Sequence, residues 1–474
     1  MVSQRVPARI AGREVVTEHW IEVRNPYDQS VVGEVPACGA AEVNEAVGAA
    51  QEALAAGAFP QFRRAQVLDR AAGLLRERQE EFARTIALEA GKPIKTARGE
   101  ATRAVETFLF AAAACRDLGG EVLPMEATEA GVGKLGFTLR VPIGVVAAIS
   151  PFNFPLNLVA HKVAPAIAAG CPVVLKPASV TPMSALALAD LLEDAGLPAG
   201  YLHVVTGSGK AVGDPLVDDP RPRLVSFTGS PEVGWGIAAR APRKRVKLEL
   251  GSNSPLIVEP DADLDAVAAK VRVAGFSHAG QSCISTQRIL VHRDIEDGLA
   301  AALRTAVQSL VLGDPLDEAT DVGPLIAPEE AERVRRLIDD AVAGGAEIVC
   351  GGDMEGSILR PTVLRNTRND QDVCQREVFG PVVAMIAYGT FDEAIALAND
   401  SDFGLHAGVF TKDLGKALAA ARRLEFGGVL VNEVPTFRAD LQPYGGVKDS
   451  GNTREGPRFA VEEMTEMRFV SFQA

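Results

Sequence analysis

One loop of the sequence has the composition of a nucleophile site. Cys283 lies in the segment Gly-Gln-Ser-Cys-Ile-Ser, residues 280–285, between a predicted helix and the predicted strand 286–291. Backbone N–H groups of a tight Gly/Ser loop can lower a thiol pKa from about 8.5 and can donate hydrogen bonds to an oxyanion. An inert core thiol is the alternative, and it suits Cys171 and Cys350 better than Cys283. Cys283 is therefore a candidate nucleophile.

A carboxylate and an amide are candidates for acid–base and oxyanion chemistry. Glu249 lies between two leucines in the predicted strand 246–250, and burial there would raise its pKa and suit a general base. Asn153 stands in Pro-Phe-Asn-Phe-Pro, where its amide could hold a carbonyl oxygen as that oxygen becomes an oxyanion. The alternatives are a polar residue on an exposed strand face for Glu249 and a helix cap for Asn153.

Polar and glycine-containing turns follow two further predicted strands, where open α/β sheets bind ligands. Lys176, Ala178 and Ser179 close the predicted strand 172–175, and Gly229 and Ser230 precede a predicted helix. Free N–H groups at a helix N-terminus suit a phosphate, and a nearby lysine can reach ribose hydroxyls or an adenosine phosphate. No G-x-G-x-x-G fingerprint follows the first strand, so the standard dinucleotide motif is not found.

The elements that must position these residues alternate along the chain. Apolar residues spaced by three and four predict a helical layer over residues 41–116, and a glycine-bearing stretch predicts a β-hairpin arm over 120–140. The strands predicted next are 143–149, 172–175, 202–205, 224–227 and 246–250, with helices over 155–169, 182–195, 209–217 and 231–239. This alternation predicts a parallel, doubly wound sheet covered on both faces. A second α/β alternation follows between residues 255 and 431.

The C-terminal run 467–472 reads as a strand without a local partner. Because unpaired strand edges are avoided, we expect this strand and the arm to complete a sheet in a neighbouring subunit. The protein would then be a homodimer or a homotetramer.

Overall composition limits the class of protein. The 474 residues are 47% hydrophobic and 23% charged, which is typical of a globular protein of about three domains. The net charge of −14 without a basic tract argues against nucleic-acid binding. The apolar run 141–149 is too short to span a membrane, and the first 16 residues lack the apolar core of a secretory signal. Six cysteines without C-x-x-C spacing predict reduced thiols in the cytoplasm, and the histidines form no metal-ligand set.

Taken in order, the motifs resemble those of the NAD(P)-dependent aldehyde dehydrogenase superfamily. They are Pro-Phe-Asn-Phe-Pro at 151–155, Lys-Pro-Ala-Ser at 176–179, Phe-Thr-Gly-Ser at 227–230, Glu-Leu-Gly at 249–251, Gly-Gln-Ser-Cys at 280–283 and Glu-Val-Phe-Gly-Pro at 377–381. The resemblance extends over residues 25–451. It is strongest to the branch of lactaldehyde, non-phosphorylating glyceraldehyde-3-phosphate, phosphonoacetaldehyde and succinate-semialdehyde dehydrogenases.

The resemblance implies a fold and a division into domains. The fold would be α/β, with a doubly wound, Rossmann-like cofactor domain, an α/β catalytic domain and a small β oligomerisation arm. The cofactor domain would comprise residues 1–119 and 140–248, and the catalytic domain residues 249–438. Residues 120–139 and 439–474 would form the oligomerisation element.

The resemblance also implies a mechanism. Cys283 would attack an aldehyde as a thiolate, while Asn153 and the Cys283 backbone N–H hold the oxyanion of the thiohemiacetal. After hydride passes to nicotinamide, Glu249 would activate the water that hydrolyses the thioester to the carboxylic acid.

NAD or NADP is the implied cofactor. Glu377 would bind the nicotinamide ribose, Phe379 would pack against the ring, and Val233 would face the adenine. The residues expected to contact the cofactor are Ile149, Ser150, Pro151, Phe152, Lys176, Ala178, Ser179, Gly209, Gly213, Phe227, Gly229, Ser230, Val233, Leu250, Gly251, Glu377 and Phe379. Members that prefer NAD often carry Glu where this chain has Ser179, so we expect NADP to be tolerated or preferred.

Two arginines are candidates for substrate binding. Arg103 and Arg438 lie in regions that line the substrate tunnel in the family, and cations there would suit an aldehyde with an anionic group. Both could instead be ion-pair residues of a surface or interface. Ser282 stands immediately before the nucleophile and is not Arg, which favours a small hydroxy-aldehyde or semialdehyde over a phosphorylated or phosphonate substrate.

Three other functions compete with this interpretation. A thiol esterase would use Cys283 and Glu249 without redox chemistry, but it would not need the cofactor motifs. A CoA-acylating semialdehyde dehydrogenase would pass the acyl group to CoA, whereas the presence of Glu249 favours water. A non-catalytic protein would be expected to lose Cys283, Glu249 or Asn153, and all three are present.

Overall fold

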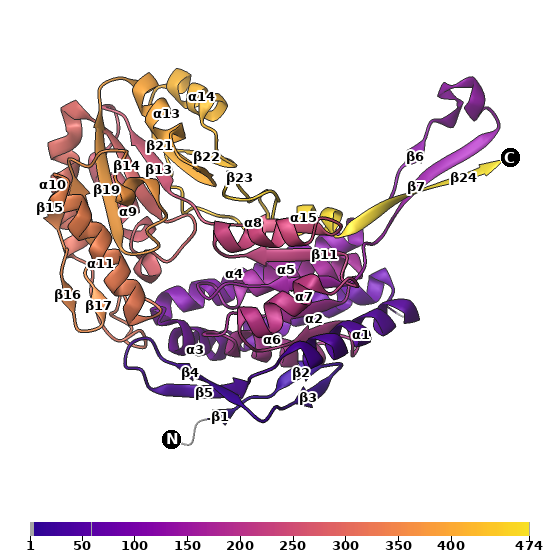
Figure 1. Ribbon diagram of the computed structural model, residues 1–474. Helices are drawn as coiled ribbons and strands as arrows, with labels where there is room; N and C mark the ends of the chain where they lie inside the picture. The colour runs from indigo at the N-terminus through magenta and orange to yellow at the C-terminus, as the bar shows by residue number, and fades with distance from the viewer. Residues whose placement is uncertain (1–3, 58, 474) are drawn as a thin grey trace.

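Two α/β lobes and a projecting arm make up the protein, as a computed structural model shows (Figure 1). The structure describes residues 4–57 and 59–473, so the predicted domain limits at residues 1 and 474 lie outside the described residues. The α/β fold class predicted from the sequence is confirmed.

The N-terminal lobe contains a seven-stranded sheet in the order β12-β11-β8-β9-β10-β2-β3. Its parallel strands are β8 (Val146–Ile149), β9 (Val173–Lys176), β10 (Leu202–Val204), β11 (Leu224–Thr228) and β12 (Arg245–Glu249). Each of these strands lies within one or two residues of its predicted range, except β8, which starts three residues later than predicted. The antiparallel edge, β2 (Ala8–Ile10) and β3 (Arg13–Val15), is not predicted, because its three-residue strands carry arginines.

Helices cover both faces of this sheet, as predicted. One face packs on α2 (Gln61–Glu77), α3 (Gln79–Ala90), α4 (Ile94–Asp117), α5 (Asn157–Ala169) and α6 (Met183–Asp194). The other packs on α1 (Ala40–Ala56), the π-helical turn Gly209–Gly213, α7 (Asp214–Asp218) and α8 (Pro231–Arg240). Alternate residues of β8 point to opposite faces: Val146 and Ala148 lie in the first core, Ala147 and Ile149 in the second.

The predicted helical layer over residues 41–116 is divided into four helices. Helices α1 and α3 each end at a glycine with positive φ, Gly57 at 63° and Gly91 at 66°. Glycine adopts this left-handed conformation without steric cost, which is why it ends helices so often.

The second lobe contains a seven-stranded sheet in the order β15-β18-β19-β14-β13-β21-β22. Its strands are β13 (Ser254–Val258), β14 (Thr286–His292), β15 (Glu347–Cys350), β18 (Thr362–Arg365), β19 (Val382–Tyr388), β21 (His406–Phe410) and β22 (Gly428–Val431). Its helices are α9 (Leu264–Ala274), α10 (Glu296–Gln308), α11 (Pro328–Ala343), α12 (Asp372–Gln375), α13 (Phe391–Asn399) and α14 (Leu414–Arg423). The sequence predicts the strands next to the Cys283 loop but no element between residues 292 and 381.

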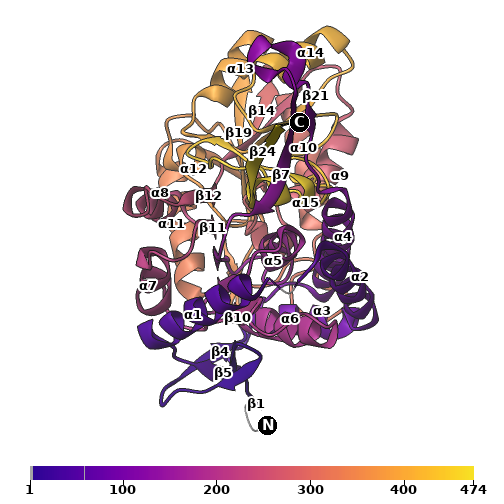
Figure 2. The ribbon, with the colours of Figure 1, turned by 90° about the vertical axis from the view of Figure 1, so that its right-hand side faces the viewer.

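The arm is a three-stranded antiparallel sheet in the order β24-β7-β6. Strand β6 (Val122–Leu123) and strand β7 (Lys134–Pro142) form the predicted hairpin. Strand β24 (Thr465–Gln473) pairs with β7 along its full length, from Thr465 beside Pro142 to Gln473 beside Lys134 (Figures 1 and 2). The C-terminal strand therefore lies with the arm and has no partner close to it in sequence, and its partner β7 belongs to its own chain.

Short elements complete the chain. They are β1 (Gln4–Arg5), β4 (Trp20–Arg24), β5 (Val31–Pro36), β16 (Met354–Glu355), β17 (Ile358–Leu359), β20 (Phe403–Gly404), β23 (Val447–Lys448) and α15 (Pro457–Glu463), with 3-10 turns Met125–Ala127, Glu129–Gly131, Ser277–Gly280 and Arg293–Ile295. Within the described residues, no helix combines the length and the apolar character needed to cross a membrane.

Candidate active site

A left-handed turn positions the loop of Cys283. His278, Ala279 and Gly280 have φ values of 51°, 53° and 70°, so three consecutive residues depart from the usual backbone conformation. A Cβ atom on Gly280 would lie 2.1 Å from the carbonyl oxygen of Gly380, so this close approach requires glycine. The turn fixes the loop that carries the half-buried Cys283 against the start of β19.

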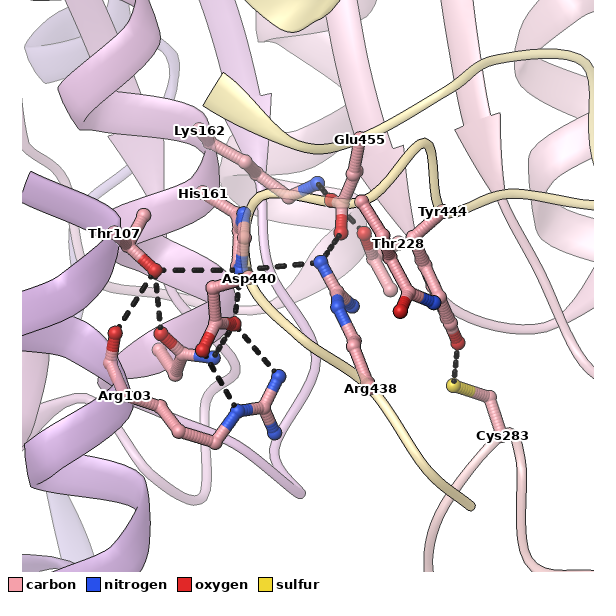
Figure 3. Close-up of polar contacts among 12 residues, drawn as sticks. Arg103, Thr107, His161, Lys162, Thr228, Cys283, Arg438, Asp440, Tyr444 and Glu455 are labelled. Atoms are coloured by element: carbon pink, nitrogen blue, oxygen red, sulfur yellow. Dashed lines mark hydrogen bonds and ion pairs between the residues drawn. The ribbon is translucent and has the colours of Figure 1, made fainter. Parts of the chain in front are cut away.

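The Cys283 thiol lies against the phenol of Tyr444. Cys283 Sγ and Tyr444 Oη are 2.8 Å apart (Figure 3). Burial raises the pKa of Cys283 to about 12, although the Tyr444 hydrogen bond and Arg438 act in the opposite direction. The prediction that the loop lowers the thiol pKa is therefore wrong for this structure. Sequence reasoning missed Tyr444, whose signal is its place in the Pro-Tyr-Gly-Gly run at 443–446.

Glu249 is a buried carboxylate at the end of β12. Neither of its oxygens has a hydrogen-bond partner among the described residues. Burial, reinforced by the negative charge of Glu455, raises its pKa well above 4.5 against the opposing effect of Arg438 and Lys162. The predicted rise is confirmed, and the alternative of an exposed strand residue is wrong because Glu249 is 4% exposed.

Asn153 connects the N-terminal lobe to the nucleophile loop. It is buried, and its Nδ2 donates to the backbone oxygen of Gln281 at 2.9 Å, two residues before Cys283. Its Oδ1 has no partner among the described residues. Asn153 does not cap the next helix, because α5 starts at Asn157 behind the cap residue Leu156.

Arg103 and Arg438 belong to one polar network, in which Arg438 is buried and Arg103 is partly exposed (Figure 3). Arg103 donates to Asp440 through Nε at 3.1 Å and Nη2 at 2.8 Å. Arg438 Nη2 lies 2.9 Å from Glu455 and 3.0 Å from His161, whose Nε2 is in turn 3.0 Å from Asp440. Each arginine is thus paired with a carboxylate, and His161 joins the two pairs.

Lys162 extends this network toward Glu249. Its Nζ donates to Thr228 at 2.6 Å and lies 3.8 Å from Glu455. Despite burial, Arg438, His161 and Lys162 hold the pKa of Glu455 below its usual range. Hydrogen bonds from His161 and Arg103 do the same for the pKa of the buried Asp440. Sequence reasoning missed Lys162, Asp440 and Glu455, although a lysine in the largely apolar helix α5 was a visible signal.

Most of the predicted cofactor residues lie at the carboxyl ends of the strands of the N-terminal lobe. Those of the N-terminal lobe follow the carboxyl ends of its parallel strands: Ile149, Ser150, Pro151, Phe152, Lys176, Ala178, Ser179, Phe227, Gly229, Ser230, Val233, Leu250 and Gly251, with Gly209 and Gly213 in the π-helical turn. Glu377 and Phe379 come from the second lobe. The rings of Phe152 and Phe379 touch edge to face at a centroid distance of 5.8 Å, so both lobes contribute to one surface.

Three observations fit a dinucleotide at this surface. Helix α8 starts behind Ser230 with Pro231, which has no N–H, and no side chain caps the N–H groups that follow, which leaves them for a phosphate. The hydroxyl of Ser150 is buried without a partner among the described residues. Burial raises the pKa of Glu377 to about 7, and a Cβ atom on Gly251 would lie 2.4 Å from its carboxylate. A ribose hydroxyl that donates to Glu377 would stabilise its ionised form.

Lys176 and Ser179 already have hydrogen bonds inside the protein. Lys176 Nζ donates to the backbone oxygen of Pro177 at 2.8 Å, and burial lowers its pKa to about 8. Ser179 Oγ donates to the backbone oxygen of Gly207 at 2.8 Å. Among the described residues, no group of His, Cys, Asp or Glu side chains is arranged to hold a metal ion.

Comparison with known proteins gives consistent matches over almost the whole chain. Residues 13–470 match the model of the aldehyde dehydrogenase family. The chain is 47% identical to the 3-sulfolactaldehyde dehydrogenase of Priestia aryabhattai over 461 residues, which are 97% of this chain and 96% of that protein.

Solved structures agree with the sequence match. The complex of aldehyde dehydrogenase 21 from Physcomitrella patens with the reaction product succinate has a TM-score of 0.97 at 40% identity, covering 100% of this chain and 99% of that one. The complex of glyceraldehyde-3-phosphate dehydrogenase GapN from Methanocaldococcus jannaschii with NADP has a TM-score of 0.93 at 39% identity, covering 97% and 100%. The chain therefore belongs to the aldehyde dehydrogenase family of NAD(P)-dependent oxidoreductases.

Proposed function

We propose that this protein oxidises a small hydroxy-aldehyde or anionic aldehyde to its carboxylic acid through a covalent bond to Cys283. The observation that carries the proposal is the meeting of three groups at the junction of the lobes. The Cys283 loop is hydrogen-bonded to Asn153. Glu249 reaches the same place, because a Cβ atom on Gly445 would lie 2.9 Å from Glu249 Oε1 and the neighbouring Tyr444 contacts Cys283 Sγ. A nucleophile, an amide donor and a carboxylate base are the parts that acyl-enzyme chemistry requires.

The first half of the reaction uses Cys283 and Asn153. Sγ gives up its proton and bonds to the aldehyde carbon, whose oxygen becomes an oxyanion that Asn153 Nδ2 and the Cys283 N–H would stabilise. The proton of Sγ passes to solvent water as the C–S bond forms, and burial, which raises the pKa of this thiol to about 12, makes that loss costly. Nicotinamide, when bound, supplies the oxidant that accepts hydride from the thiohemiacetal and leaves a thioester.

The second half uses Glu249. A carboxylate with a raised pKa is a stronger base than an exposed one, so Glu249 is suited to take a proton from a water molecule. The resulting hydroxide attacks the thioester carbon, the C–S bond breaks, and the acid leaves as Cys283 recovers a proton. Glu249 favours water over CoA as the acyl acceptor.

NAD and NADP are both proposed as cofactors, with NADP tolerated or preferred. Ser179 places no carboxylate beside the expected adenosine ribose, so a 2′-phosphate meets no negative charge from this residue. The structural neighbour complexed with NADP is consistent with this proposal.

Arg103 and Arg438 are proposed to bind an anionic group of the substrate. Arg103 pairs with Asp440 through Nε and Nη2, and Nη1 takes no part in that pair. The Arg103 side chain is 30% exposed, whereas the Arg438 side chain is 5% exposed. The name of the Priestia relative supports an anionic hydroxy-aldehyde, because sulfolactaldehyde carries both a sulfonate and a hydroxyl group.

The arm is proposed to join subunits into a homodimer or homotetramer. Leu135, Leu139, Phe469 and Phe472 on its strands are 44% to 57% exposed, an unusual density of apolar surface for a projecting sheet. At its base, a groove of about 930 Å³ lies between the arm, α4 and α15. Light scattering after size-exclusion chromatography should give a dimer or tetramer mass, and a monomer mass would contradict this proposal.

All six cysteines are free thiols, which fits a cytoplasmic location.

Initial rates test the proposed function directly. The purified protein is assayed with NAD and with NADP against 3-sulfolactaldehyde, lactaldehyde, succinate semialdehyde and propanal, and reduced nicotinamide is read by absorbance. We expect acid to form without CoA and an anionic or hydroxy-aldehyde to be preferred. If no aldehyde reduces either cofactor, the proposal fails; a requirement for CoA would favour the CoA-acylating alternative.

A further inference from the structure

We propose that the phenol of Tyr444 recognises the C2 hydroxyl group of the aldehyde, which makes the site selective for 2-hydroxy aldehydes. The inference rests on the proposed function, because it takes Cys283 Sγ as the atom that bonds to the aldehyde carbon. It assigns to Tyr444 a specificity role.

The phenol of Tyr444 lies directly beside the nucleophile. Tyr444 Oη is 2.8 Å from Cys283 Sγ. When Sγ bonds to C1 of an aldehyde, the substituents of C2 are two bonds from the carbon that the sulfur holds. The substituents of C2 must therefore lie close to the sulfur, where Tyr444 Oη also lies.

The hydroxyl of Tyr444 has a weak hydrogen-bond partner. Tyr444 is 2% exposed, and Cys283 Sγ is the one hydrogen-bond partner of its hydroxyl among the described residues. A thiol is a weak partner, and the sulfur loses its proton when it bonds to substrate. A buried phenol without a partner is costly, so the hydroxyl favours a ligand that offers a new one. A C2 hydroxyl group provides this partner, whereas a C2 methylene does not.

Tyr444 is held rigidly by its neighbours. The Arg438 guanidinium lies 3.8 Å above the centre of its ring, and the His406 ring contacts it edge to face at 5.0 Å. The backbone N–H of Tyr444 donates to the backbone oxygen of Glu455 at 3.1 Å, and the backbone N–H of Glu455 donates to the backbone oxygen of Tyr444 at 2.6 Å. The phenol is therefore held in place before substrate binds, so little entropy is lost when it forms a hydrogen bond.

The contact with Arg438 connects this inference to the anionic group. The same ring touches the thiol through its hydroxyl and the proposed anion-binding guanidinium through its face. A three-carbon aldehyde with a hydroxyl at C2 and an anionic group at C3 would offer a partner to each of these protein groups. Glu455 holds the guanidinium in this position.

A simpler role for the hydrogen bond makes a different prediction. If Tyr444 only holds the Cys283 thiol, its hydroxyl affects all aldehydes equally, and removing it changes their rates by the same factor. If Tyr444 also binds the C2 hydroxyl, removing its own hydroxyl lowers the rates of 2-hydroxy aldehydes more than the rates of other aldehydes. The ratio of kcat/KM for two aldehydes therefore separates the two roles.

Lactaldehyde and propanal are the matched pair, because they differ by the C2 hydroxyl alone. We expect wild-type protein to favour lactaldehyde and Tyr444→Phe to lower the lactaldehyde-to-propanal ratio of kcat/KM by about tenfold. Tyr201→Phe is the control, since Tyr201 is a buried tyrosine that packs on Phe59 in the first core. It should leave the ratio unchanged.

The outcomes separate this inference from the proposed function. If the wild type oxidises aldehydes but Tyr444→Phe has the wild-type ratio, the specificity role is overturned and the proposed function stands. If the wild type oxidises neither aldehyde with either cofactor, the proposed function fails and the inference fails with it. Should Tyr444→Phe not fold, the wild-type ratio decides, because a value of one or less overturns the inference.

Discussion

Gly445 covers the carboxylate of Glu249 so closely that a Cβ atom at this glycine would lie 2.9 Å from Glu249 Oε1. The same Cβ atom would lie 2.0 Å from the backbone oxygen of Thr453. The loop that follows Tyr444 therefore confines Glu249, and the loss of solvent contributes to its raised pKa. This confinement determines how the rate should depend on pH.

Turnover should increase with pH through a pKa above 4.5, because Glu249 acts as a base only when ionised. The raised pKa keeps the carboxyl protonated at low pH, so the rate is lost on the acid side. Glu249→Gln should slow steady-state turnover by about 10² to 10⁴-fold. A burst of reduced nicotinamide should remain, because hydride transfer comes before the hydrolysis step that needs Glu249. Stopped-flow absorbance measures both phases, and rapid steady turnover of the variant would remove Glu249 from the role.

Cys283→Ala should abolish dehydrogenase turnover and leave cofactor binding intact, because the thiol forms the covalent bond but does not hold the dinucleotide. Initial rates and fluorescence titration with NADPH measure the two properties. Cys350→Ala is the control, since Cys350 lies at the end of β15 in the second lobe's core. Near-normal turnover of Cys283→Ala would contradict the nucleophile assignment.

Ser179→Glu should shift cofactor preference toward NAD by about tenfold, because the new carboxylate would repel a 2′-phosphate. The ratio of kcat/KM for NADP and NAD with one aldehyde is the measurement. Ser179→Ala removes the hydrogen bond to Gly207 without adding charge, so it separates electrostatic repulsion from a local change of structure. An unchanged ratio in Ser179→Glu would show that this position does not face the phosphate.

Arg103→Leu should raise KM by about tenfold for an anionic aldehyde such as succinate semialdehyde, and leave KM for propanal nearly unchanged. The side chain is partly exposed, so its loss leaves less uncompensated buried charge than the loss of Arg438. Steady-state kinetics with both substrates check the prediction. Equal increases for both would make Arg103 a structural partner of Asp440.

Arg438→Leu should reduce the free energy of unfolding by about 3 to 5 kcal/mol, because it leaves Glu455 buried without its cation. Urea unfolding monitored by circular dichroism gives this value. Adding Glu455→Gln to Arg438→Leu should recover part of the loss, since it removes the unpaired charge. A variant as stable as the wild type would mean that Lys162 alone satisfies Glu455.

The parallel strands of the first sheet were predictable because their sequences are short apolar runs separated by helical lengths. The elements between residues 292 and 381 were not predicted, although Val334, Leu337, Ile338 and Ala341 form a clear buried stripe on α11. Pairing of β24 with β7 was missed for a different reason. The two strands are more than 300 residues apart, so no turn between them marks the pairing in the sequence.

The site was predictable where a residue type alone suggests chemistry, as with Cys283, Glu249 and Asn153. Contacts between distant segments were not. The Cys283 thiol contacts Tyr444, which lies 161 residues later in the sequence. No residue near Cys283 in the sequence indicates that burial raises the pKa of the thiol. The partner of Arg103 was similarly hidden, because Asp440 comes from a loop 337 residues later.

The pairing of β24 with β7 also sets an order for biosynthesis. A chain is made from its N-terminus, so β7 leaves the ribosome long before Thr465–Gln473, the strand that covers one of its edges. Until then, the backbone N–H and C=O groups of that edge can pair with another chain. Completion of the arm is therefore a late event in synthesis. A chain cut short before residue 465 would keep its nucleophile and base but expose a strand edge that invites aggregation.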